Sequence, residues 1–209
     1  MAVSRTLGWV AVALVASGCG NDFVPSVVNT GTAVLTYQAP GTDFGSFSTY
    51  AIVTQMAVID DTTGVPVYTF QPAPEIIGAV ERNMNSRGFV LVARIDPENP
   101  PVVPVDADLA INVSVFTGTD YAFVPCDYWS WWGIPGYGCD QPWQWVAYRV
   151  GTLLVEMGDL AHPQPGPVIP RLWAGAGYSV LTPENARNVQ IAVGAIDQAF
   201  LQSPYLVTP

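Results

Sequence analysis

Alternation of apolar and polar positions predicts several strands along this chain. From 109 to 116 the apolar residues Leu109, Ile111, Val113 and Val115 alternate with smaller or polar residues, which is typical of a half-buried strand. Other segments with strand character are 33–37, 47–53, 89–93, 146–157 and 169–180. The last two are separated by a loop rich in glycine and proline, which predicts a hairpin. The segment 60–72 contains the breakers Gly64 and Pro66 and is predicted to be a loop.

Two segments have the apolar spacing of a helix. The first begins at Pro74, because proline is tolerated in a first helical turn, and is expected to end at Gly88. The second begins at Thr182, which has the side chain of an N-cap, and ends before Ser203. Their apolar stripes are Ile77, Val80 and Met84 in the first helix and Val189, Val193, Ile196 and Phe200 in the second. The order of these elements predicts an α+β fold, with two helices packed on a mostly antiparallel β-sheet.

The N-terminal segment has the pattern of a secretory signal. Arg5 is followed by an apolar run, Leu7–Ala16, that is too short to span a bilayer. The following residues, Ala-Ser-Gly-Cys at 16–19, resemble the lipobox of bacterial lipoproteins, in which the cysteine sulfur receives a diacylglyceryl group. The alternative is an ordinary secreted protein with a chance cysteine. The predicted organisation is a signal peptide at 1–18, a lipidated tether at 19–31 and a single α+β domain at 32–209.

Lipidation of Cys19 predicts the location of the protein. One acyl chain contributes only about 0.8 kcal/mol per buried methylene, so stable anchoring needs more than one chain. The lipoprotein resemblance implies several chains on Cys19. Under the enterobacterial sorting rule, an Asp after the cysteine would favour the inner membrane, so Gly20 favours the outer membrane. The expected location is the cell envelope, with the membrane as partner through the lipid.

Charge and composition exclude several classes of function. The formal net charge is −10 and the chain contains no lysine, although half of its residues are hydrophobic. An acidic chain repels phosphate backbones, so no nucleic-acid partner is expected. The absence of lysine excludes Schiff-base chemistry and Walker-type phosphate loops. No cofactor is expected.

An aromatic-rich insert is predicted at about 120–145. It interrupts two strand patterns that could otherwise pair directly through a short turn. Cys126 and Cys139 lie within it, and in an oxidising compartment they are most simply joined as a disulfide. A metal site is not expected, because the only histidine is His162. The candidate binding loop comprises Trp129, Trp131, Trp132, Tyr137, Trp143 and Trp145.

Two interpretations of these aromatic residues remain open. If exposed, they would bind an envelope protein, the sugar rings of a polysaccharide or the interfacial zone of a membrane. If buried, they would fold back over the sheet as a small secondary core. The first interpretation makes the insert a binding loop, and the second makes it structural.

Enzymatic alternatives depend on a few polar residues. Glycoside hydrolysis needs two converging carboxylates, and the candidate pairs are Glu156 with Asp159 and Asp106 with Asp108. Acids of this kind usually solvate strand ends. His162 is expected to be an exposed loop residue, because no G-x-S-x-G motif accompanies it. The sequence therefore favours a non-enzymatic binding or assembly role, with an envelope hydrolase acting on glycan as the alternative.

Several stretches together resemble one family of bacterial envelope lipoproteins, the domain of unknown function 4136. They are "FSTYAIV", "PEIIGAVERNMNSRGFVLV", "ADLAINVSV", "YRVGTLLVEMGDL", "RLWAGAGYSVL" and "AFLQSPY". No single stretch is distinctive, whereas their order along the chain is. The resemblance implies a lipoprotein with a compact α+β domain and implies no established activity.

Overall fold

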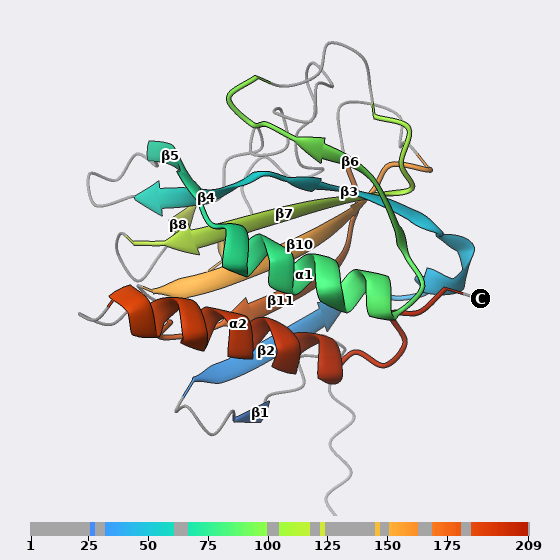
Figure 1. Cartoon of the computed structure of the whole chain (residues 1–209). Helices are drawn as coiled ribbons and strands as arrows, with labels where there is room; N and C mark the ends of the chain where they lie inside the picture. The colour runs from blue at the N-terminus through green and yellow to red at the C-terminus, as the bar shows by residue number, and fades with distance from the viewer. Residues whose placement is uncertain are drawn as a thin grey trace, which may run out of the picture.

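Two α-helices cover one face of a nine-stranded sheet in the part of the chain that the structure describes (Figure 1). The structure is a computed structural model. It describes residues 26–27, 32–60, 67–99, 105–117, 122–123, 145–146, 151–162, 169–180 and 185–208. The predicted α+β class with two helices is confirmed.

The large sheet has the strand order β1-β2-β11-β10-β7-β3-β6, with β4 beside β7 and β5 beside β4. Its strands are β1 (Ser26–Val27), β2 (Ala33–Gln38), β3 (Thr49–Val53), β4 (Gln55–Asp60), β5 (Val67–Pro72), β6 (Val90–Ile95), β7 (Leu109–Phe116), β10 (Thr152–Asp159) and β11 (Arg171–Gly177). Two short strands, β8 (Ala122–Phe123) and β9 (Trp145–Val146), form a separate pair. A single 3-10 turn, η1, spans Phe44–Ser46.

The large sheet is mixed: five of its eight described strand pairs are antiparallel, in line with the predicted mostly antiparallel sheet, but three pairs are parallel, which the sequence did not predict. From β1 to β7 every neighbouring pair is antiparallel. Beyond β7, however, β3 runs parallel to both β6 and β7, and β4 runs parallel to β7. Parallel neighbours need a crossover connection, and α1 (Pro74–Ser86) lies in the connection from β3 to β6. Alternation along a strand reports which side chains are buried and carries no information on strand direction.

The β4–β5 hairpin corrects a second prediction. Residues 67–72 were expected to belong to a loop, but they form β5, which pairs with β4 from Gln55 opposite Pro72 to Asp60 opposite Val67. Pro72 is compatible with this position because it ends an edge strand, where a missing N–H costs no ladder bond. Gly64 and Pro66 lie outside the described residues.

Strands β3 and β4 form one interrupted strand along β7. Tyr50 pairs with Leu109 in the first half and Ala57 pairs with Ser114 in the second. Thr54 separates the halves and donates its N–H to the Ile95 carbonyl at 2.8 Å. On the outer side, β6 pairs with β3 and β5 pairs with β4.

The helices begin and end close to where the sequence predicts. Pro74 is the first residue of α1, and the helix ends before Gly88, whose φ of 91° is accessible mainly to glycine. The second helix, α2, is described from Asn185 to Leu201, and the predicted cap Thr182 lies outside the described residues. Asn83 of α1 donates to Asp197 of α2 at 2.7 Å, which joins the two helices.

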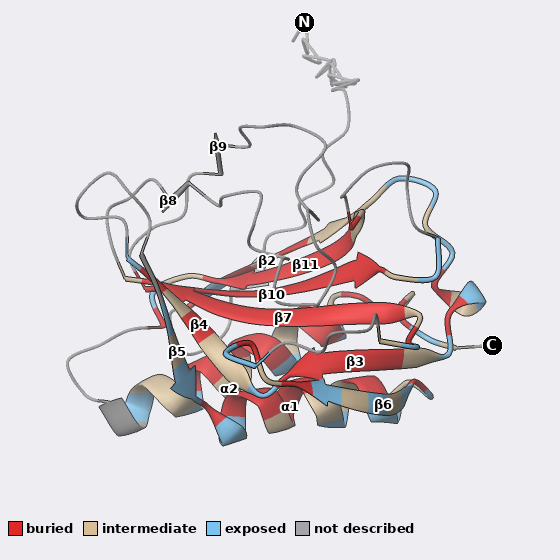
Figure 2. Ribbon diagram, turned by 90° about the horizontal axis from the view of Figure 1, so that it is seen from above, coloured by how far each residue is buried: buried red, intermediate tan, exposed pale blue. Residues whose placement is uncertain are grey.

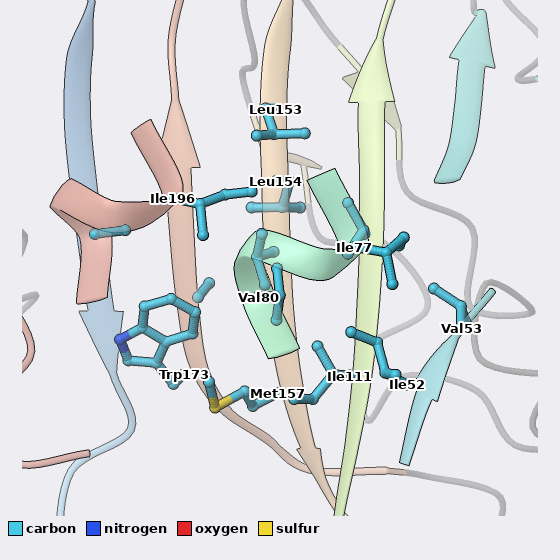
Figure 3. Close-up of a cluster of buried hydrophobic side chains, with 14 of the residues drawn as sticks. Ile52, Val53, Ile77, Val80, Ile111, Leu153, Leu154, Met157, Trp173 and Ile196 are labelled. Carbon is cyan, nitrogen blue, oxygen red and sulfur yellow. The ribbon is translucent and has the colours of Figure 1, made fainter. Parts of the chain in front are cut away.

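The hydrophobic core lies between the helices and the sheet (Figure 3). Ile77 and Val80 of α1 and Ile196 of α2 lie over the strands, where Ile111 and Trp173 are fully buried. The stripe predicted for α1 is buried. In α2, Ile196 and Phe200 of the predicted stripe are buried, whereas Val189 and Val193 are only partly buried.

Helix α2 approaches β11 closely because β11 carries glycines on the helix side. A Cβ on Gly177 would lie 2.7 Å from the Ala195 Cβ, and one on Gly175 would lie 2.9 Å from the Ala199 Cβ. Real Cβ atoms do not approach so closely, so any larger residue would push the helix away from the sheet. The two glycines of "RLWAGAG" are therefore packing residues.

Candidate functional site

The predicted insert leaves the sheet where β7 and β10 meet. Phe116, the last residue of β7, pairs with Thr152, the first residue of β10, and the Gly151 N–H donates to the Phe116 carbonyl at 2.7 Å. Gly151 has a φ of 79°, which a glycine adopts without steric cost. Residues 117–151 therefore leave and rejoin the sheet at one place, and the prediction that the flanking strands pair directly is confirmed. These residues are the insert from here on.

A second pairing lies within the insert. Ala122 pairs with Val146 and Phe123 pairs with Trp145, so β8 and β9 bring the two sides of the insert together again. The backbone of the insert is thus fixed at two successive levels, first at the sheet and then at the β8–β9 pair.

Most of the predicted site residues lie outside the described residues. These are the lipid-attachment residue Cys19, the cysteines Cys126 and Cys139, and the aromatic residues Trp129, Trp131, Trp132, Tyr137 and Trp143. Trp145 lies in β9, where only its backbone is described.

A row of polar side chains lies on the sheet face opposite the helices. Leu153 and Val155 of β10 line the contact with α2, so alternation directs Glu156 to the other face. Across the antiparallel pair, Glu156 lies opposite Asn112 of β7. Every residue of β7 and β10 is buried, on both faces (Figure 2). The polar residues of this row are thus held inside the protein.

The centre of this row is an ion pair. The Arg171 guanidinium donates to Glu156 Oε1 at 3.0 Å, and it also lies over the Tyr37 ring at 5.4 Å. The side chain of Glu156 is only 4% exposed, whereas that of Arg171 is 28% exposed. Breaking such a pair is costly, because it leaves a charge without its partner in a medium of low polarity.

Two buried oxygen atoms near this pair make no hydrogen bond among the described residues. They are Glu156 Oε2 and Ser114 Oγ. Sequence reasoning singled out Glu156 but missed Asn112, Ser114 and Arg171. A usable signal was present, because polar residues at 112, 114 and 156 interrupt the two most apolar strands at alternating positions.

The structure does not bring Glu156 and Asp159 together as a carboxylate pair. The two residues are three positions apart on one regular strand, and the sheet therefore separates their side chains. Asp159 accepts the His162 N–H at 2.9 Å, and its Oδ2 lies 3.1 Å from His162 Nδ1. The His162 ring meets the Phe47 ring edge-on, and its side chain is 64% exposed. The exposed position expected for His162 is confirmed.

Asp108 of the second candidate pair joins two strands. Its Oδ2 accepts the N–H groups of Ser48 and Thr49 at 2.7 and 2.8 Å and the Ser48 hydroxyl at 3.0 Å. Burial alone would raise the pKa of Asp108, but these hydrogen bonds outweigh it and lower the pKa. Asp106 is exposed in the same turn. This carboxylate is committed to holding the start of β3 beside the start of β7.

Two further features are absent from the described part of the chain. Within these ranges no three His, Cys, Asp or Glu side chains gather as a metal site would require. Neither described helix is both long enough and apolar enough to cross a membrane.

The chain is similar to one protein family and to several solved structures. The family model called domain of unknown function (DUF4136) matches residues 34–205. Among solved structures, the chain is similar to a DUF4136 family protein from Bacteroides thetaiotaomicron, with 30% identity, a TM-score of 0.57, and coverage of 83% of this chain and 96% of that one. It is also similar to a PelC dodecamer from Paraburkholderia phytofirmans, with 12% identity, a TM-score of 0.39, and coverage of 85% and 99%. Among curated proteins, none matches.

Proposed function

This chain belongs to the DUF4136 family, and from that premise we propose that it is a non-enzymatic lipoprotein of the cell envelope that contacts a partner through its insert. In this proposal Cys19 carries the lipid, the outer membrane holds the protein, and a disulfide between Cys126 and Cys139 restrains the insert. The partner is an envelope protein.

The observation that carries the proposal is the double fixation of the insert. The Phe116–Thr152 pair closes its base on the sheet, and the Phe123–Trp145 pair closes it again further along the chain. Between the two strands of this second pair lie both cysteines and five of the six candidate aromatic residues that the sequence offers for contact; the sixth, Trp145, lies in β9 itself. Segments that a rigid scaffold holds at their ends are common sites of binding.

The carboxylates argue against the hydrolase alternative. Glu156 is bound to Arg171, Asp159 to His162, and Asp108 to the backbone of β3. A general acid and a nucleophile must converge on one substrate bond, roughly 5–9 Å apart, with access for the glycan. Each of these acids instead has a structural partner, and Glu156 and Asp159 point to opposite faces of the sheet.

Lipidation is tested by metabolic labelling. Radiolabelled palmitate should enter the wild-type protein and not Cys19→Ala, whereas Cys126→Ala should label like the wild type. Equal labelling of the wild type and Cys19→Ala would contradict the anchor. The disulfide is tested on the same preparation, in which a non-reduced digest should contain the Cys126 and Cys139 peptides linked. Two free thiols in freshly isolated protein would contradict it.

The contact role is tested by replacing Trp129, Trp131 and Trp132 with alanine. Crosslinking in the native host should lose a protein partner, while the melting temperature stays close to that of the wild type. The control is Leu201→Ala, which removes an apolar side chain that is 70% exposed on α2. A large drop in melting temperature would show that the rings are core residues, and binding of polysaccharide in place of a protein would reassign the partner.

A further inference from the structure

The two edges of the sheet differ in their distance from the proposed lipid. Ser26 and Val27 form β1, which pairs with Val34 and Ala33 at one edge. The β6 strand lies at the opposite edge, and Figure 1 shows β1 and β6 on opposite sides of the molecule. The chain enters the described fold at β1, so any anchor at Cys19 acts on that edge first.

The chain between Cys19 and β1, which is the first part of the predicted tether at 19–31, is too short to let the opposite edge of the sheet reach the membrane. Six residues separate Cys19 from Ser26, and the seven steps from one to the other span at most roughly 25 Å when fully extended. From β1 to β6 there are six strand spacings, or about 29 Å at 4.8 Å each. A path over the surface of the domain is longer still. An anchored molecule therefore cannot rest its β6 edge on the membrane.

Charge distribution favours the same orientation. The sequence contains no charged residue from 23 to 42, which includes β1 and β2, and none from 172 to 183, which includes most of β11. On the β6 side, Arg94 of β6 offsets Glu81 of α1 in an ion pair of 2.9 Å, and the turn after β6 carries two further acids, Asp96 and Glu98. Acidic groups are repelled by anionic lipid within about 8 Å, the Debye length at physiological ionic strength. The uncharged edge approaches such a surface without this cost.

Tyr178 supports this orientation. Its backbone N–H donates to the Ala33 carbonyl at 2.9 Å, which places the residue at the same edge, and its side chain is half-buried. Tyrosine side chains are enriched at membrane–water interfaces because one end is apolar and the other is polar.

We infer that the β1–β2 edge, comprising β1, β2 and the turn at Tyr178, faces the lipid surface, and that β6 and the acidic turn after it point away from the membrane. This inference rests on the proposed anchoring through Cys19. It places β6, where Val90 and Val92 are exposed, on the side of the molecule that is open to other envelope components.

Energy transfer to labelled lipids tests the orientation. The lipidated protein is reconstituted in vesicles of phosphatidylethanolamine and phosphatidylglycerol that carry an acceptor dye on a headgroup. A donor dye is coupled to a non-natural residue with a bio-orthogonal reactive group, which replaces Ala33 in one variant and Val92 in its matched control. Because the dye is not coupled through a thiol, the native cysteines stay intact. Both positions are exposed, in β2 and β6, and lie five strand spacings, or roughly 24 Å, apart. Transfer from position 33 should be at least about twofold greater, because the two positions differ by that distance in the sheet.

The possible failures are distinguishable. If the protein does not float with the vesicles, the anchoring itself is wrong and the orientation falls with it. If it floats but position 92 transfers as strongly as position 33, or more strongly, the orientation alone is wrong. Amide exchange of the unlabelled protein gives a second measurement that needs no substitution in the domain. Residues 26–38 should exchange more slowly on vesicles than in soluble Cys19→Ala, and residues 90–95 should exchange equally in both.

Discussion

The indole N–H of Trp173 donates to Ser203 Oγ across 2.9 Å, and both residues are completely buried. Trp173 lies in β11, and Ser203 lies in the turn that follows α2. The Trp173 ring also packs against Phe200, with 5.2 Å between the ring centroids. Two of the stretches that resemble the family, "RLWAGAGYSVL" and "AFLQSPY", thus meet at one hydrogen bond that holds the end of α2 on the sheet.

Ser203→Ala should destabilise the protein by about 1–3 kcal/mol, because it leaves a buried indole N–H without an acceptor. Trp173→Phe removes the donor together with part of the ring and should cost more. The double variant should be destabilised by less than the sum of the two single variants, since its second substitution has no hydrogen bond left to break. Urea unfolding of the four proteins measures this coupling, and strictly additive losses would show that the bond contributes nothing.

A pair of glycines provides a test of the contact between α2 and β11. Gly177→Ala should destabilise the fold by about 1–3 kcal/mol, because the new Cβ would lie 2.7 Å from the Ala195 Cβ. Gly194 lies within α2, and a Cβ there would meet no atom within 4 Å. Gly194→Ala should therefore stabilise by up to about 1 kcal/mol through helix propensity. Thermal unfolding of both variants checks the prediction, and a shift in the same direction for both would contradict it.

Periodicity in the sequence predicted most of the secondary structure, because side chains at one interval share one environment. The stripe of Ile77, Val80 and Met84 is buried in α1, and the alternation from Leu109 to Val115 is a strand. The same reasoning failed at β5, where Gly64 and Pro66 drew attention to a turn and away from the alternating residues that follow it. It also missed the parallel pairs that β3 and β4 form with their neighbours, because strand direction there depends on the crossover through α1 and not on local pattern.

The candidate site was less accessible to sequence reasoning. Glu156 and Asp159 are close along the chain, yet strand geometry places them on opposite faces. The partner of Glu156 is Arg171, which follows on the next strand after a long loop, and nothing in the local sequence around either residue pairs them. Asp108 shows the same limitation, because its partners Ser48 and Thr49 are about sixty positions away.

Substitutions at the Glu156–Arg171 pair should be asymmetric. Arg171→Met leaves the more deeply buried carboxylate without its cation and should cost about 3–5 kcal/mol. Glu156→Met leaves a guanidinium that is 28% exposed and reaches water, so it should cost less. The double variant should be more stable than Arg171→Met alone, because no unpaired charge remains. Chemical denaturation ranks the three proteins, and a double variant that is the least stable of the three would contradict the argument.

The lowered pKa of Asp108 predicts a loss of stability in acid. The carboxyl of Asp108 titrates below its usual value of 3.8 in the folded protein because Ser48 and Thr49 donate to its ionised form. Its contribution is therefore complete above the pKa of the unfolded chain and is lost as the pH falls through the lower folded pKa. Asp108→Asn should lower stability at neutral pH and flatten the acid limb of the stability curve. Denaturation at several pH values between neutral and acid measures the free energy of unfolding of both proteins. An acid limb in Asp108→Asn as steep as that of the wild type would show that other groups account for the loss of stability in acid.

The raised pKa of Tyr50 predicts a loss of stability as the pH rises in alkali. Burial, with a smaller contribution from the Glu81 carboxylate, raises the pKa of Tyr50 to about 12, and its hydroxyl donates to Asn85 Oδ1 at 3.0 Å. Above pH 10 the phenol ionises in the unfolded chain while it stays neutral in the folded protein, so the unfolded state binds fewer protons. The free energy of unfolding should then fall as the pH rises from 10 to about 12.

Tyr50→Phe should be less stable at neutral pH but should lose less stability over that interval than the wild type. Phe89→Leu, at a buried aromatic residue that does not titrate, is the control, and it should keep the alkaline slope of the wild type. An alkaline slope that is unchanged in Tyr50→Phe would show that Tyr50 does not control it.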